Sequence, residues 1–121
     1  MKVQCISVAD ALDRQATASP WLTVGSTYNV LSVVLDVHSR WWLRLISDQR
    51  SSIGLFRREQ FQIVSANLPS TWIVSWSDGG TFELSPQEWL VPRFWERYFE
   101  GDGDARAAFE REARKIIESE P

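Results

Sequence analysis

Between residues 21 and 84, apolar and polar positions alternate in short runs that are separated by turn residues. The runs are rich in β-branched and aromatic side chains, which are typical of β-strands. We expect strands over residues 28–37, 41–47, 53–56, 61–65, 72–77 and 82–84, with a weaker candidate over residues 3–8. Asp78-Gly79-Gly80 joins the last two, because glycine adopts the positive φ angles of a tight hairpin turn. Five or six short strands at this spacing predict a small barrel or a strongly bent sheet.

The phase of the alternation is informative in two of these runs. The apolar parity of residues 28–37 shifts near residues 31–33, which predicts a bulge or a bend at that point. In the next run, alternation places Leu43 toward the core and leaves Trp42 and Arg44 on the outer face.

The end of the last strand carries a helix-start signal. Ser85 and Glu88 have the spacing of a capping box, and Pro86 falls at the first helical position, where its missing N–H costs nothing. Leu84 and Trp89 have the spacing of the hydrophobic staple that often accompanies such a box. We therefore expect a short helical turn here.

Helical spacing continues to the C-terminus. Pro92 interrupts the first turn, and a second helix is expected over residues 92–100, with Gly101 as its stop. Its aromatic residues fall on one broad face, which indicates core positions: Phe94, Trp95, Tyr98 and Phe99. Apolar residues with a 3.6 period then predict a tail helix, which Asp102 or Asp104 can cap.

A chain of 121 residues indicates one domain. We divide it into an N-terminal segment at 1–20, in which residues 10–16 could form a helical turn, a barrel at 21–85 and C-terminal helices at 86–119. The net charge of −3 is uneven: residues 1–77 hold seven Lys and Arg against five Asp and Glu, whereas residues 78–121 hold six against eleven. An acidic C-terminal third favours a basic partner and disfavours nucleic acid.

The inventory of reactive side chains is sparse. Cys5 is the only cysteine and His38 the only histidine, so a tetrahedral zinc site is not expected, and no cofactor motif is present. A Cys5–His38 nucleophile–base pair is conceivable, but nothing in the sequence brings the two together, and we expect no enzyme. A chain without an evident signal peptide, membrane span or disulfide is expected to be cytoplasmic.

Several arginines of the first half lie among aromatic residues. The arginines are Arg40, Arg44, Arg50, Arg57 and Arg58, and the aromatic residues among them are Trp41, Trp42 and Phe56. Such a pattern on a small barrel could stack single-stranded nucleic acid, although charges at strand edges that prevent aggregation are the commoner reason for it. Single-stranded nucleic-acid binding is therefore the alternative function.

The ordered set of motifs resembles small bacterial immunity proteins, the partners of polymorphic and contact-delivered toxins. The residues that carry this resemblance are Leu22-Thr23-Val24-Gly25, Tyr28-x-Val30-Leu31, Gly54-Leu55-Phe56, Phe61-x-Ile63-Val64-Ser65, Leu68-Pro69-x-x-Trp72, Asp78-Gly79, Pro86-x-x-Trp89 and Phe94-Trp95-Glu96-x-Tyr98-Phe99. The resemblance covers most of the chain after residue 20. It implies an α+β fold, with a small SH3-like antiparallel barrel of five to six strands followed by two C-terminal helices.

The resemblance also implies a stoichiometric inhibitor that occludes a cognate toxin domain, in a family without shared active-site residues. Our hypothesis for the toxin is a basic nuclease, in keeping with the acidic C-terminal third. Tight complexes of this kind use aromatic anchors and complementary charge. The candidate partner-binding residues are the acids Asp78, Glu83, Glu88, Glu96, Glu100, Asp102 and Asp104 and the anchors Trp42 and Trp89. No metal, cofactor or membrane partner is expected.

Overall fold

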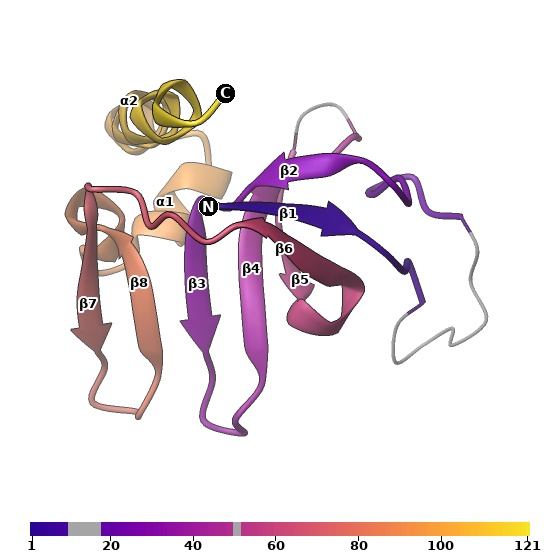
Figure 1. Ribbon diagram of the computed structural model, residues 1–121. Helices are drawn as coiled ribbons and strands as arrows, with labels where there is room; N and C mark the ends of the chain where they lie inside the picture. Colours follow the sequence, from indigo (N-terminus) through magenta and orange to yellow (C-terminus); the bar gives the residue numbers. More distant parts are fainter. Residues whose placement is uncertain (10–17, 50–51) are drawn as a thin grey trace.

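The chain folds into two antiparallel β-sheets with helices at its C-terminal end, in a computed structural model that describes residues 1–9, 18–49 and 52–121 (Figure 1). The α+β class and the two C-terminal helices are confirmed. The helical turn expected over residues 10–16 lies outside the described residues. Hydrogen bonds between the described strands form two separate sheets and do not close them into one continuous barrel.

The smaller sheet has the strand order β2-β1-β6, and the larger one has the order β5-β4-β3-β8-β7. The strands are β1 Lys2–Cys5, β2 Thr27–Asn29, β3 Ser32–Leu35, β4 Trp41–Ile46, β5 Ile53–Arg57, β6 Phe61–Ser65, β7 Trp72–Trp76 and β8 Phe82–Pro86. The helical elements are the 3-10 helices η1 Arg58–Gln60 and η2 Gln87–Leu90 and the α-helices α1 Phe94–Phe99 and α2 Gly103–Ser119.

The predicted long strand over residues 28–37 bends and changes sheets. Its first part, β2, pairs with β1, and its second part, β3, pairs with β4 and β8. Val30 and Leu31 lie at the bend, fully buried, and their backbone N–H groups donate to the carbonyls of Met1 and Arg44, 3.0 and 2.8 Å away. The bend predicted from the shift in parity is therefore confirmed.

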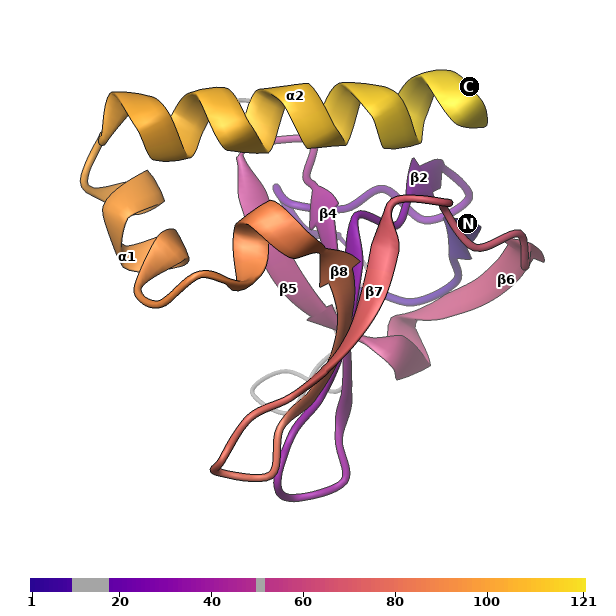
Figure 2. The same ribbon diagram turned by 90° about the vertical axis from the view of Figure 1, so that its left-hand side faces the viewer.

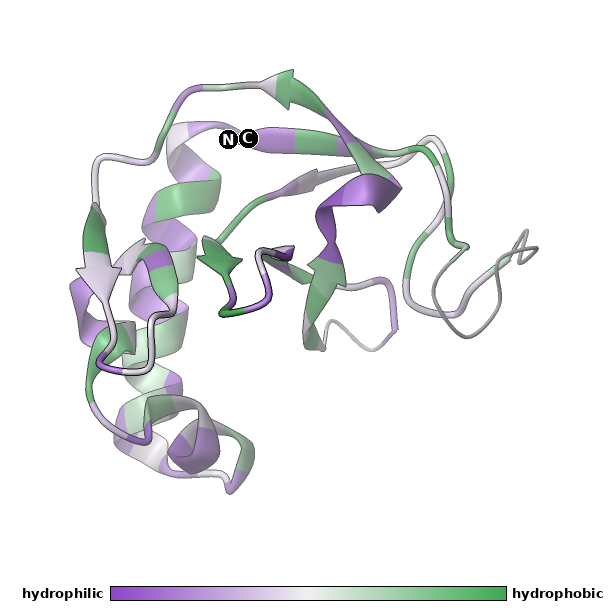
Figure 3. Ribbon diagram, turned by 90° about the horizontal axis from the view of Figure 1, so that it is seen from below, coloured by the Kyte–Doolittle hydropathy of each residue, from purple (hydrophilic) through white to green (hydrophobic). Residues whose placement is uncertain are grey.

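The core has two parts. One lies between the sheets and contains Val3, Val33 and Leu45, while the other lies under the helices and contains Trp89 and Phe109. Half-buried Trp72 packs against both parts. α2 lies across one end of the sheets, at the top of Figures 1 and 2. Hydrophobic and hydrophilic residues alternate along this helix in Figure 3, and its apolar side faces the second part of the core.

Arg44 is the main departure from the predicted strand faces. We expected its side chain on an outer, solvated face, but only 8% of the residue is exposed. Its guanidinium lies 4.1 Å from the ring centroid of Trp95 in α1, donates to the Ser32 hydroxyl at 2.8 Å and pairs with Glu83 at 3.3 Å. The prediction was wrong because α1 covers this face of the larger sheet, so β4 is buried on both sides.

The predicted capping box is also wrong. Ser85 belongs to β8, where it lies opposite Ile73 and is completely buried. The side chain that precedes η2 makes no capping hydrogen bond. Glu88 instead forms an ion pair with Arg111 of α2. Cross-strand pairing thus extends the strand to the point where the local sequence signal predicts a helix cap.

The junction between α1 and α2 is formed by the helix stop and the helix cap that the sequence predicts. Gly101 has a φ angle of 90°, and its N–H donates to the carbonyl of Tyr98 at 3.1 Å. The next N–H, that of Asp102, donates to the carbonyl of Arg97 at 3.0 Å, which completes a Schellman motif. The Asp102 carboxylate then accepts a hydrogen bond from the N–H of Ala105 at 3.0 Å. The predicted stop at Gly101 and the predicted cap at Asp102 are confirmed.

Candidate partner-binding surface

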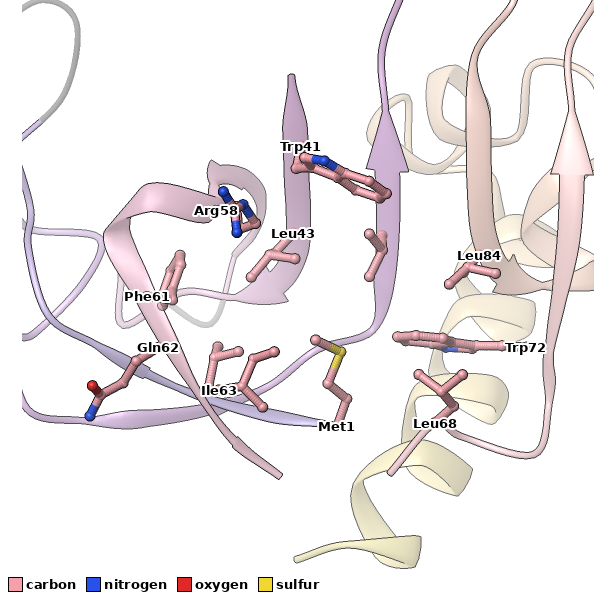
Figure 4. Close-up of a pocket in the computed structure, with 12 residues that line it drawn as sticks. Met1, Trp41, Leu43, Arg58, Phe61, Gln62, Ile63, Leu68, Trp72 and Leu84 are labelled. Carbon is pink, nitrogen blue, oxygen red and sulfur yellow. The ribbon is translucent and has the colours of Figure 1, made fainter. Parts of the chain in front are cut away.

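An apolar groove opens where β6 diverges from β3, β8 and β7. It encloses about 360 Å³, and the residues that line it include Met1, Trp41, Ile63, Leu68 and Trp72 (Figure 4). Ile63 and Leu68 are 62% and 63% exposed. The groove is thus a place where the apolar space between the sheets reaches the surface.

The apolar surface continues from the groove onto the hairpins. The β3–β4 and β7–β8 hairpins project beyond the smaller sheet, at the bottom of Figure 2. Side chains alternate along a strand, so Val74 and Trp76 share the face of Trp72, which lines the groove. They are 59% and 72% exposed, and Trp76 packs edge-on against Phe82 with 5.0 Å between ring centroids.

We call this continuous surface the open face. Its residues are Trp41, Ile63, Leu68, Val74, Trp76 and Phe82. Exposed apolar side chains that gather in this way mark interaction sites, whereas single ones scattered over a surface are ordinary.

A sequence signal for this surface exists, and our prediction missed it. From residue 60 to residue 77 the chain contains no Asp, Glu, Lys or Arg, although 24% of the whole chain is charged. This uncharged run holds β6, β7 and their connection, and with them four residues of the open face. Depletion of charge together with enrichment of Trp is typical of the centre of a protein interface.

The predicted acidic residues do not form one surface. Glu83 pairs with Arg44 at 3.3 Å, and Glu96 pairs with Arg93 at 2.9 Å. Glu88 bridges to α2, and Asp102 caps it. These four acids therefore have structural partners.

Three predicted acids are exposed and form no ion pair within the part of the chain that the structure describes: Asp78, Glu100 and Asp104. Glu100 and Asp104 lie at the corner between α1 and α2, beside Phe99, which is 62% exposed. Asp78 lies at the opposite end of the molecule, in the turn between β7 and β8 next to Trp76 (Figure 2). Among these acids, only Asp78 adjoins the open face.

The two predicted aromatic anchors, Trp89 and Trp42, both make contacts within the protein. Trp89 is 2% exposed and stacks on Phe109 with 5.1 Å between ring centroids, so it is a core residue and not an anchor. Its predicted staple partner, Leu84, packs in the other part of the core. Half-buried Trp42 donates its indole N–H to the carboxylate of Asp36 at 2.9 Å.

The arginines near Trp42 are engaged by neighbouring acids. Arg40 and Arg57 lie 5.7 and 5.3 Å from the centroid of the Trp42 ring. Arg40 pairs with Asp36 at 2.9 Å and Arg57 with Glu59 at 3.3 Å. The hydrogen bond from Trp42, followed by those from the backbone and side chain of Arg40, holds the pKa of the Asp36 carboxyl far below its usual value. Binding of single-stranded nucleic acid stays a prediction, with fewer free arginines than the sequence indicated.

Cys5 and His38 are not brought together. Cys5 is 1% exposed in the core, and burial raises the pKa of its thiol. His38 is exposed in the turn between β3 and β4. Within residues 1–9, 18–49 and 52–121, no three His, Cys, Asp or Glu side chains gather in a way that could hold a metal ion. None of the helices in these same ranges combines the length and apolarity needed to cross a membrane.

Comparison of the chain with models of known protein families, with curated proteins and with solved structures finds no match.

Proposed function

We propose that this chain is a non-enzymatic binding protein of the cytoplasm that neutralises a cognate toxin domain, with the open face as its contact surface. The observation that carries the proposal is the exposure of Trp76 and its neighbours on the projecting hairpins. Tryptophan is enriched among the residues that dominate binding energy, and large apolar patches on monomers are often functional. The resemblance of the sequence motifs to immunity proteins supplies the class of the partner.

We also propose that the first six strands are an SH3-like barrel to which the β7–β8 hairpin has been added. In support, one long strand bends from the smaller sheet into the larger one as β2 and β3. The 3-10 helix η1 then leads from β5 into β6, and β6 returns to pair with β1. The hairpin extends the larger sheet beyond β3, and this addition supplies Val74, Trp76 and Phe82 of the open face.

Acidic residues contribute less to the proposed contact with the partner than the sequence indicated. Asp78 lies at the border of the open face and can meet a basic residue of the partner. Glu100 and Asp104, at the far end of the molecule, contribute to long-range attraction of a basic toxin domain, which raises the rate of association more than the affinity.

The first step is to search the genes that neighbour this one for a protein with a toxin domain. The experiment is then a calorimetric titration of the purified chain with that domain. Trp76→Ala is expected to weaken binding about 30-fold or more, because truncation of a central Trp costs about 2 kcal/mol or more. Phe99→Ala is the matched control, since Phe99 is a similarly exposed aromatic residue next to the acidic corner. Weaker binding by Phe99→Ala with unchanged binding by Trp76→Ala would move the contact to that corner and refute the open face.

A further inference from the structure

The strand β7 is a regular, uncovered edge of the larger sheet. It pairs with β8 through five consecutive residue pairs without a register shift, and no described strand lies on its other side. In Figure 2, β7 faces the viewer with no helix or strand in front of it. Its backbone edge is therefore open to solvent.

The pairing with β8 fixes which backbone groups of β7 are free. The N–H of Ser77 donates to the carbonyl of Thr81 at 2.9 Å, so these two residues form a hydrogen-bonded pair. Bonded and non-bonded pairs alternate in an antiparallel ladder, which directs the N–H and C=O groups of Val74 and Trp76 outward. Trp72 directs its carbonyl outward too, while its N–H donates to Pro69 at 3.2 Å.

The other sheet edges carry features that discourage pairing. β6 contains a register shift at Val64, since Lys2 pairs with Ser65 and Val3 with Ile63, and such bulges disrupt an edge. β5 ends in charged Arg57.

The last edge, β2, has only three residues, and its Asn29 donates a hydrogen bond to the backbone carbonyl of Glu120 at 2.8 Å. Short, charged or bulged edges resist the addition of another strand. Of the edges that the structure describes, β7 alone is regular, uncharged and uncovered.

We infer that β7 pairs with β7 of a second copy of this chain, antiparallel about a two-fold axis at Val74. This axis places Val74 opposite its own equivalent, and the outward N–H and C=O groups of the two residues bond reciprocally. The N–H of Trp76 then meets the free carbonyl of Trp72 in the other copy. The carbonyl of Trp76 is left to solvent, because the N–H of Trp72 that lies opposite it already donates to Pro69.

The absence of charge favours a second copy over an unrelated strand. A two-fold axis places each residue near its own equivalent, so a charged side chain at the centre of β7 would face a like charge. The uncharged run over residues 60–77 removes this repulsion. Of the open face, Val74 and Trp76 lie at the seam of this pair, because both belong to β7. The rest of the open face belongs to other segments and stays available to the proposed partner: Trp41, Ile63, Leu68 and Phe82.

The experiment is sedimentation equilibrium of the intact chain over a range of concentrations. Wild type is expected to show a reversible monomer–dimer equilibrium. Val74→Lys is expected to raise the dissociation constant of the dimer about tenfold or more, because two ammonium groups replace a Val–Val contact at the axis. Val64→Lys is the matched control: the same substitution, at similar exposure, on the bulged edge β6.

A second variant, Val74→Pro, removes only an outward N–H and should weaken the dimer while circular dichroism shows that the fold is kept. A wild-type chain that stays monomeric at every concentration, which would leave β7 for a strand of another protein, overturns the inference. A dimer that Val64→Lys weakens and Val74→Lys leaves unchanged also overturns the inference.

Discussion

The buried ion pair between Arg44 and Glu83 allows a sharp test of how the helices and the sheet fit together. Replacing Arg44 by Met keeps the apolar stem of the side chain and removes its charge, which leaves Glu83 without a counter-ion. The two side chains are 9% and 18% exposed, so water replaces the lost partner poorly. The Ser32 hydroxyl also loses the guanidinium that donates to it at 2.8 Å.

Loss of one partner from a buried pair typically costs 3–5 kcal/mol of unfolding free energy, and the partial exposure of Glu83 places this case near the lower end, at about 3 kcal/mol. In a domain of this size, that loss lowers the Tm by roughly 10 °C. Burial already raises the pKa of Glu83 in the wild type, against the opposing effect of Arg44. Burial likewise lowers the pKa of Arg44. Burial thus opposes the charged form of each partner, and the attraction between the two side chains opposes that effect.

The sign of the pH dependence follows from the raised pKa of Glu83. Below the unfolded-state pKa of 4.5, both states hold the proton, and Arg44→Met loses mainly the contacts of the guanidinium. As the pH rises through the native pKa, the native state must bury an unpaired carboxylate and loses stability. The difference between wild type and Arg44→Met should therefore grow from pH 4.5 to pH 7.

Urea unfolding at these two pH values measures the difference, with Glu83→Gln and the double variant Arg44→Met/Glu83→Gln completing the cycle. Because Gln carries no charge, the double variant should recover much of the stability that the single variant loses at pH 7. An equal loss for Arg44→Met at both pH values, with no recovery in the double variant, would refute the buried-pair reasoning.

Three further changes have defined outcomes. Trp89→Ala removes a residue that is 2% exposed and should lower the free energy of unfolding in urea by about 3–5 kcal/mol; a loss below about 1 kcal/mol would contradict its core position. Gly101→Ala should cost about 1–2 kcal/mol because φ is 90° there, whereas Gly103→Ala, with open space around its Cβ, should be neutral or slightly stabilising. Hydrogen bonds, first that from Ser65, lower the pKa of Glu120 to about 2, so wild type should lose its stability advantage over Glu120→Gln as the pH falls from 4.5 toward 2; a constant difference would contradict this role.

The parts of the fold that were predictable from the sequence depend on local chemistry. The turn at Gly80 has a φ angle of 89°, and the hairpin that it joins was predicted from its turn residues. Gly101 and Asp102 end one helix and begin the next through hydrogen bonds that span only a few residues. In each case the backbone conformation is selected by the residues that adopt it.

The errors arose where distant segments decide the environment. Alternation placed Arg44 correctly on the face opposite Leu43, but the sequence does not show that α1 covers that face. Ser85 has the spacing of a cap, yet pairing with Ile73 of β7 keeps it in a strand. The sequence is compatible with Trp89 as a core residue or as an anchor. Its stacking on Phe109 shows that it belongs to the core.

The candidate site was predicted less well than the fold. Most of the predicted contact residues were acidic. Several of these acids form ion pairs or caps that depend on the tertiary structure. The uncharged run over residues 60–77 was readable in the sequence, but only the structure shows that it borders a groove and continues onto Trp76 and Phe82. A missing charge is informative only once the exposure of the segment is known.

The most direct test of the proposed function is growth of bacteria that produce a toxin domain found in a gene next to this one. Co-production of the wild-type chain is expected to restore growth, Phe99→Ala to restore it equally, and Trp76→Ala to restore it poorly at the same protein level. Growth that stays arrested in the presence of the folded wild-type chain would contradict the account.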